Sequence, residues 1–245
     1  MKNIVLLTSA VYSSYGIYTP QERINQTLET ALSAKKYIPG AVVILVDNSQ
    51  VAVQNDNSPE FDELIDSVDY YIDNSDDPNI QFFHNNVTNY DIGKNSMEVI
   101  GLIKALTYIS SDREMMRQVS DANRIYKLSG RYKITDKFDI TQHDNENTKE
   151  KYVFKQRQPA WCDQTVTGVS TLLQTRLYSF TPDLFGMTIN LFQEIIQNMI
   201  NIYNQQKYID VEHSMVKFIP ADKLVELETV GLTGNIAPNG MMIID

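Results

Sequence analysis

Hydrophobic residues form two short continuous runs near the start of the chain, with a helix-like segment between them. Residues 4–8 and 41–46 are almost entirely apolar, which is typical of strands that are covered on both faces. Residues 19–22, Thr-Pro-Gln-Glu, predict a helix start with a capping box and a proline in the first helical position. Residues 39–40, Pro-Gly, predict its end. We therefore expect a β-α-β unit with parallel strands.

The remaining chain mixes both periodicities, with no internal repeat and no linker. The pattern predicts helices at 58–68, 97–109, 185–203 and 210–220, the third being the longest, and strands at 69–72, 80–84, 124–129, 152–155, 172–180 and once within 225–244. Residues 135–150 are polar and acidic, which predicts a surface loop. The alternation of elements indicates a single α/β domain with a mostly parallel central sheet flanked by helices.

Composition limits the classes of protein that this chain can represent. A formal charge of −10 argues against a dedicated nucleic-acid binder but still allows a locally basic pocket for an anionic small molecule. The single cysteine excludes an internal disulfide framework and fits a reducing compartment. The first apolar run is too short for a signal peptide, and no window reaches the ~18 apolar residues of a membrane span. A cytoplasmic location is the expectation.

The segment 124–132, Arg-Ile-Tyr-Lys-Leu-Ser-Gly-Arg-Tyr, carries the strongest indication of a binding site. It predicts a buried strand that runs into a turn carrying Lys127, Arg131 and Tyr132. Gly130 allows close backbone approach where the strand stops. Ligands of open α/β sheets gather at the carboxyl ends of strands, and one guanidinium can bind two phosphate oxygens at once. An anionic, phosphate-bearing ligand is therefore expected here.

Several common motifs are absent from the sequence. No Gly-x-Gly-x-x-Gly follows the first strand, which argues against a dinucleotide-dependent oxidoreductase. There is no phosphate-binding loop ending in Gly-Lys-Ser/Thr and no nucleophile elbow. The acidic stretches at 73–79 and 136–147 lack the spacing of a calcium loop. They are expected to be solvated loops.

Two short motifs carry a resemblance to a known family. Residues 127–134, Lys-Leu-Ser-Gly-Arg-Tyr-Lys-Ile, and 210–215, Asp-Val-Glu-His-Ser-Met, resemble the GT-A type of nucleotide-sugar glycosyltransferase. The similarity is to capsule- and lipopolysaccharide-type sugar transferases of microbes and their viruses. It implies a GT-A-like (Rossmann-like) single domain over 1–245, with a nucleotide-binding half at 1–120 and a donor and acceptor half at 121–245. It also implies a nucleotide-sugar donor, a glycan or other hydroxyl acceptor, and a role in polysaccharide biosynthesis.

The resemblance assigns roles to individual positions. Thr8 and Ser9 fall where such enzymes hold the nucleoside, and Asp47 falls where a strand-end carboxylate contacts base or ribose. The segment with Lys94 and Glu98 is similar to the one that approaches the donor. The donor-binding residues implied in this way are Thr8, Ser9, Asp47, Lys94, Lys127 and Arg131.

The chain departs from the family at the place of its usual Asp-x-Asp pair. That pair holds a divalent cation, whereas Ser129-Gly130-Arg131 offers no carboxylate. We therefore assign no metal ligands, leave a manganese or magnesium requirement open, and expect Arg131 and Lys127 to neutralise the leaving diphosphate.

Acceptor-side roles follow from the same resemblance. Glu212 or Asp210, at a helix start, is the expected general base, which would make the enzyme inverting. Trp161 and Asp163 are the expected acceptor-binding residues, because aromatic faces stack on sugar rings. Ordinary structural roles compete with these assignments: a helix cap for Asp210 with dipole stabilisation for Glu212, a solvated charge for Lys127, a turn for Asp47, a core anchor for Trp161, and no ligand for the lone histidine His213.

Two other functions remain open on the sequence. The first is a nucleotidyltransferase on a similar sheet, although residues 9–18 contain only one glycine where a Gly-rich loop would be expected. The second is a catalytically silent protein that binds a nucleotide or sugar through the same fold. The sequence does not specify the donor, the acceptor, the linkage or the oligomeric state.

Overall fold

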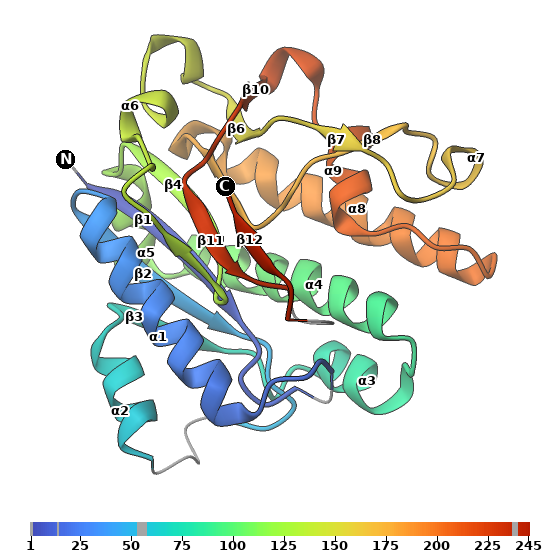
Figure 1. Ribbon diagram of the computed structural model, residues 1–245, viewed down its shortest axis with the longest axis horizontal. Helices are drawn as coiled ribbons and strands as arrows, with labels where there is room; N and C mark the ends of the chain where they lie inside the picture. The colour runs from blue at the N-terminus through green and yellow to red at the C-terminus, as the bar shows by residue number, and fades with distance from the viewer. Residues whose placement is uncertain (1, 14, 53–57, 237–239) are drawn as a thin grey trace.

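The computed structural model describes residues 2–13, 15–52, 58–236 and 240–245, and its centre is a seven-stranded sheet (Figure 1). Strand β9 pairs antiparallel with β4 and β6, while the other neighbours in this sheet pair in parallel. In sheet order, the strands are β10 (Leu224–Leu227), β6 (Tyr152–Lys155), β9 (Leu177–Phe180), β4 (Arg124–Ser129), β1 (Asn3–Ser9), β2 (Ala41–Asp47) and β3 (Tyr70–Asp73).

Helices cover both faces of this sheet. The helices that the structure describes are α1 (Pro20–Tyr37), α2 (Pro59–Asp66), α3 (Pro78–Asn86), α4 (Tyr90–Ser111), α5 (Arg113–Ser120), α6 (Ile140–His143), α7 (Gln164–Thr167), α8 (Phe185–Asn204) and α9 (Val211–Phe218), with 3-10 turns η2 (Glu146–Thr148), η3 (Pro182–Leu184) and η4 (Ala221–Lys223). Within the described ranges, no helix combines the length and apolar character needed to cross a membrane.

The apolar run of β1 explains how the two layers are held together. Ile4 and Leu6 face the core formed with α4, α5, α8 and α9. Val5 and Leu7 point the other way, into the core formed with α1 and α2. All four side chains are at most 1% exposed, as expected for a strand between two helical layers.

The predicted β-α-β unit is confirmed. β1 and β2 pair in parallel from Asn3 opposite Ala41 to Ser9 opposite Asp47. Thr19 caps α1, and Glu22 completes the capping box by accepting from the Thr19 amide at 2.7 Å. The expected α/β class with a mostly parallel sheet is therefore correct.

The strand predicted at 80–84 is wrong, because these residues belong to α3. Asp77 caps this helix, Pro78 opens it, and Ile80 and His84 are buried one turn apart. A five-residue segment in which only Ile80, Phe82 and Phe83 are apolar does not distinguish a strand from a helix face. The next helix also begins earlier than expected, at Tyr90 after the Asn89 cap, so Lys94 lies on α4 rather than in a loop before it.

The second half of the chain differs from the prediction in several further places. The strand expected at 172–180 is divided into β8 (Thr171–Leu172) and β9 by a turn, and β8 pairs with β7 (Gln158–Pro159). The tail contains three strands, β10, β11 (Leu232–Asn235) and β12 (Met242–Ile244), the last two in a small sheet with β5 (Tyr132–Ile134). The expected loop at 135–150 contains α6 and η2, and α4 rather than α8 is the longest described helix.

Candidate functional site

A pocket opens at the carboxyl ends of the central strands. It is lined by Thr8 and Ser9 at the end of β1, by residues 129–131 after β4, and by Lys94 and Glu98 of α4. β1 and β4 are parallel neighbours, so their ends meet at one edge of the sheet. The fold thus brings together four of the six residues expected to bind the donor: Thr8, Ser9, Lys94 and Arg131.

Gly130 sets how closely the two strand ends approach. Its amide donates to the Thr8 carbonyl at 2.8 Å. A β-carbon at this position would lie 3.0 Å from the same carbonyl oxygen and 3.2 Å from the Thr27 hydroxyl. The structure confirms the predicted close approach, which places Arg131 directly beside the end of β1.

Arg131 is a half-buried cation with unused donors. Its Nε is buried and has no hydrogen-bond partner within the described ranges, and none of the ion pairs found there involves its guanidinium. Its charge nevertheless acts on its neighbours, since burial first and then Arg131 lower the pKa of Arg23. A ligand oxygen in this pocket would meet an uncommitted guanidinium.

Lys127 is held quite differently. It lies inside β4 rather than in the following turn, and its side chain is 1% exposed. Its ammonium pairs with the Glu98 carboxylate and donates to Ser129 Oγ at 2.7 Å and to the Thr175 carbonyl at 2.8 Å. These three acceptors use the three protons of an ammonium. Its direct contact with the donor stays a prediction, and its structural role is to support the pocket floor.

Glu98 is the carboxylate nearest to this group of cations. Burial raises the pKa of Glu98, but the charges of Lys127, Lys94 and Arg131 and the hydrogen bond from Lys127 outweigh it, so the net pKa is lowered. Glu98 therefore stays ionised and paired, and the remaining positive charge of Lys94 and Arg131 is available to a ligand.

Two further residues hold the loop that borders the pocket. Arg23 of α1, which the sequence did not single out, donates to the carbonyls of Ala10 (2.9 Å) and Tyr15. Asp47 is fully buried and accepts from the amides of Val11 and Ser49, both at 3.1 Å. Burial raises the pKa of Asp47, and these hydrogen bonds oppose the rise. The expected contact of Asp47 with base or ribose stays a prediction.

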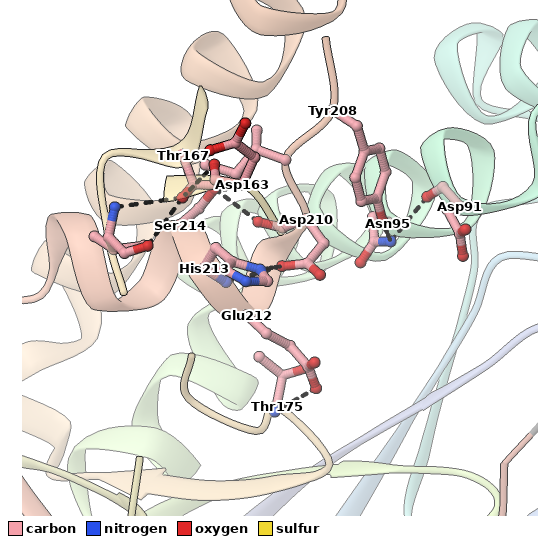
Figure 2. Close-up of polar contacts among 12 residues, drawn as sticks. Asp91, Asn95, Asp163, Thr167, Thr175, Tyr208, Asp210, Glu212, His213 and Ser214 are labelled. Atoms are coloured by element: carbon pink, nitrogen blue, oxygen red, sulfur yellow. Dashed lines mark hydrogen bonds and ion pairs between the residues drawn. The ribbon is translucent and has the colours of Figure 1, made fainter. Parts of the chain in front are cut away.

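Glu212 lies in the first turn of α9, and its side chain points toward Thr175 (Figure 2). Its Oε1 accepts from the Thr175 amide at 3.4 Å, while the Thr175 carbonyl accepts from Lys127. Burial and the neighbouring Asp210 raise the pKa of Glu212, against the opposing charges of Arg176 and Lys94. Thr175, in the segment before β9, thus contacts both Glu212 at the start of α9 and Lys127 of β4.

Asp210 has the capping role that was considered beside its catalytic one. Its Oδ1 accepts from the His213 amide at 2.8 Å and lies 2.6 Å from His213 Nδ1 (Figure 2). Its side chain is nearly inaccessible. Of the two carboxylates proposed as a base, Glu212 is therefore the one with fewer competing partners.

The predicted acceptor residues lie beside α9 rather than in the pocket. Trp161 is 61% exposed, so it is not a core anchor. Its ring packs on Tyr208 with centroids 5.7 Å apart and meets His213 edge-on at 5.5 Å. Asp163 is exposed and caps α7 by accepting from the Thr165 amide at 2.8 Å. Both acceptor assignments stay predictions.

The residues at the end of β4 do not fit the divalent cation that this type of fold commonly holds. Magnesium and manganese prefer several oxygen ligands. Here residues 129–131 contribute a hydroxyl and a guanidinium, and the carboxylate of Glu98 is paired with Lys127. No step of the chemistry below is derived through a metal at this position.

No protein-family model matches the chain, and no curated protein sequence matches it. Solved structures do match. An active-site mutant of LgtC aligns over 91% of this chain and 72% of its own, at 9% identity and a TM-score of 0.52. This likeness confirms the expected GT-A-like fold. A complex of galactosyltransferase LgtC with donor and acceptor sugar analogs (8% identity, 91% and 72% covered, TM-score 0.45) also matches. A glycosyltransferase involved in glycosylation of the major capsid of PBCV-1 matches as well, at 10% identity and a TM-score of 0.45, over 93% of this chain and 82% of its own.

Proposed function

We propose that this protein transfers a sugar from a nucleoside diphosphate to a hydroxyl group of a glycan or similar acceptor. The observation that carries this proposal is the placement of Arg131 and Lys94 in one pocket at the sheet edge, with the Glu212 carboxylate of α9 within electrostatic reach of Lys94. Two cations and one carboxylate are the groups that such a transfer needs. The fold shared with LgtC agrees with this function.

Arg131 and Lys94 stabilise the leaving nucleoside diphosphate. Negative charge grows on the diphosphate as the bond to the sugar breaks, and preorganised cations lower the energy of that state. Neither side chain has an ion-pair partner within 4 Å among the described residues, so neither must first release one. Thr8 and Ser9 border the same pocket on the nucleoside side.

Glu212 acts as the general base. It accepts the proton of the acceptor hydroxyl while that oxygen bonds to the anomeric carbon and the bond to the diphosphate breaks. A single displacement of this kind inverts the anomeric configuration. Trp161 and Asp163, on the neighbouring loop, bind the acceptor, with the exposed indole face stacking on a sugar ring.

The pH dependence follows from the environment of Glu212. A base works only when deprotonated, so activity falls as the pH drops through its pKa. Because burial and Asp210 raise the pKa of Glu212, the acidic limb lies above that of an exposed glutamate. Arg176→Gln removes a charge that lowers this pKa, so the limb should move to higher pH. An unchanged limb would contradict the assignment of Glu212 as the base.

The experiment that tests the function begins with a thermal-shift panel of UDP-, GDP-, CMP- and dTDP-sugars, with and without manganese. The donor that stabilises the protein is then assayed for transfer. Glu212→Gln should reduce turnover by about 10²–10⁴-fold and leave donor binding unchanged, whereas Glu146→Gln, an exposed residue of η2, should change neither. Release of pyrophosphate would instead indicate a nucleotidyltransferase, and binding without turnover a silent protein.

A further inference from the structure

A second group of reactive side chains lies at the start of α9, and none of its members lines the pocket. Potential metal-ligand atoms of Cys162, Asp210 and His213 all lie within 4.8 Å of one another. Cys162 comes from the loop between β7 and α7, and the other two residues come from the start of α9. The fold thus joins two distant segments through a thiol, a carboxylate and an imidazole.

His213 supplies an independent indication that something binds here. The residue is 0% exposed, and its Nδ1 lies 2.6 Å from Asp210 Oδ1. Its other ring nitrogen, Nε2, is buried without a hydrogen-bond partner among the residues that the structure describes. The helix cap accounts for Nδ1 but not for Nε2, and a buried polar atom without a partner is unfavourable.

A comparison with the other histidines distinguishes this position. His84 also has an unpartnered ring nitrogen, but it belongs to no group of three potential ligands in the described part of the chain. His143 Nδ1 lies 2.8 Å from the Ser179 hydroxyl. Only at His213 do an open ring nitrogen, a thiol and a carboxylate coincide within the described ranges.

The local electrostatics favour a bound cation. Burial, then the charges of Asp210 and Asp91, raise the pKa of the Cys162 thiol to about 12. The same negative charges that oppose a thiolate attract a metal cation, which stabilises the thiolate directly.

We propose that Cys162, Asp210 and His213 bind zinc or a similar divalent transition metal. Sulfur, nitrogen and carboxylate ligands are those that zinc prefers, whereas magnesium and calcium take oxygen ligands. Ligand atoms of a tetrahedral zinc site lie roughly 3–4 Å apart, given bonds of about 2.0–2.3 Å. The donor atoms now lie within 4.8 Å of one another, so binding requires the side chains to close on the ion, and Asp210 Oδ1 must leave His213 Nδ1 to meet an ion held at Nε2.

Bound metal would fasten the loop carrying Trp161 to α9. The Trp161 ring already meets His213 edge-on, so the ion would lie beneath the exposed indole. Three protein ligands leave a fourth position for water or another small ligand. This inference does not depend on sugar transfer, and metal binding is measurable on the protein alone.

Cobalt substitution tests the site, because the chain has a single cysteine. Any charge-transfer band from thiolate to cobalt in the near ultraviolet must then come from Cys162. We expect such a band to saturate at one cobalt per chain and to disappear in Cys162→Ser. Because Cys162 is half-buried, this variant should fold. Asp163→Asn, a neighbouring carboxylate outside the three donors, should keep the band. Absence of the band in the wild-type protein would overturn the proposal.

Zinc provides a second readout that does not depend on a buried substitution. Zinc should raise the Tm of the wild-type protein and slow modification of Cys162 by a thiol reagent at least tenfold, and Cys162→Ser should lose the Tm increase. His213→Gln and Asp210→Asn should each weaken cobalt binding at least tenfold. If both variants show the charge-transfer band with wild-type affinity for cobalt, the assignment of these three residues as ligands is wrong.

Discussion

Two arginines lie at the opposite ends of strand β4, Arg124 as its first residue and Arg131 two residues beyond its last, and their side chains differ in their partners. Arg124, at the start, is 0% exposed and donates to Ser179 Oγ at 2.7 Å and to the carbonyls of Thr148 (3.1 Å) and Lys151 (2.9 Å). Burial lowers the pKa of Arg124 to about 10. Arg131, just past the end, keeps its Nε unpartnered within the described chain.

The contrast separates a cation whose donors are satisfied by the protein from one whose donors are free to meet a ligand. At the amino end of β4, backbone carbonyls satisfy the guanidinium and attach the 148–151 segment to the sheet. At the carboxyl end, where strand ends meet, the guanidinium is left with unused donors. Lys127, between them, supports the site through Glu98 rather than offering a free charge.

The largest effect is expected for the residue between the two arginines. Lys127→Met leaves the Glu98 carboxylate without its partner in a largely buried position, so the free energy of unfolding should fall by about 3–5 kcal/mol. Denaturant unfolding measures this. Adding Glu98→Gln to Lys127→Met should recover part of the loss, and Lys133→Met on the exposed face of β5 should have little effect. Equal stability of Lys127→Met and wild type would contradict the supporting role.

The next effect separates Arg124 from surface arginines. Arg124→Ala removes the buried guanidinium that donates to the Ser179 hydroxyl and to the carbonyls of Thr148 and Lys151, so we expect a loss of about 2–4 kcal/mol in the free energy of unfolding. Arg117→Ala, in an exposed pair with Glu114, should change stability by about 0.5 kcal/mol or less. A loss no larger for Arg124→Ala than for Arg117→Ala would remove the contrast.

Arg131→Ala should show the reverse behaviour. Stability should change by about 0.5 kcal/mol or less, because the buried Nε has no hydrogen-bond partner among the described residues. Binding of a nucleoside diphosphate should weaken by about 1.5–3 kcal/mol, the worth of a charge-assisted hydrogen bond. Calorimetry measures both, with Lys133→Ala as the matched control. A variant that is strongly destabilised would place Arg131 with Arg124 among structural residues.

The last prediction concerns the pH dependence of stability at His143, which shares the Ser179 hydroxyl with Arg124. Burial, then Arg124, lower the pKa of His143 to about 3 from 6.5. The unfolded chain therefore takes up a proton below pH 6.5 that the folded protein does not. This contribution is complete above pH 6.5 and is lost toward pH 3, at about 1.4 kcal/mol per pH unit. His143→Gln should flatten the pH dependence of the free energy of unfolding between pH 6.5 and 5. The same slope in the variant and the wild-type protein would contradict this assignment.

The sequence predicted the features that depend on local pattern. The runs at 4–8 and 41–46, the capping box at Thr19 and the close approach at Gly130 were all confirmed. The strand expected at 80–84 was wrong although Asp77 and Pro78 carried a helix-start signal. Short apolar runs fit either element, so the start signal was the better guide.

The sequence could not predict the partners of buried polar residues. Arg124 and Arg23 donate to backbone carbonyls in loops or turns that are distant from them in the sequence. No sequence motif marks such a carbonyl as an acceptor. Lys127 was recognised as important, but its enclosure by Glu98 and Thr175 depends on the packing of α4 and the turn before β9. Cys162 meets His213 only because the loop after β7 folds over α9.

The central claim is that side-chain cations at the end of β4 bind a diphosphate without a divalent metal. It is tested most directly by calorimetric titration of the preferred nucleoside diphosphate in excess chelator, using wild-type protein, Arg131→Ala and Lys133→Ala. The titration is repeated in Cys162→Ser, so that stripping a metal from the second site is not mistaken for loss of binding. We predict unchanged affinity in chelator for wild type and Cys162→Ser, and at least tenfold weaker binding for Arg131→Ala alone. Binding that vanishes with chelator, or an Arg131→Ala variant that binds as tightly as wild type, would contradict the account.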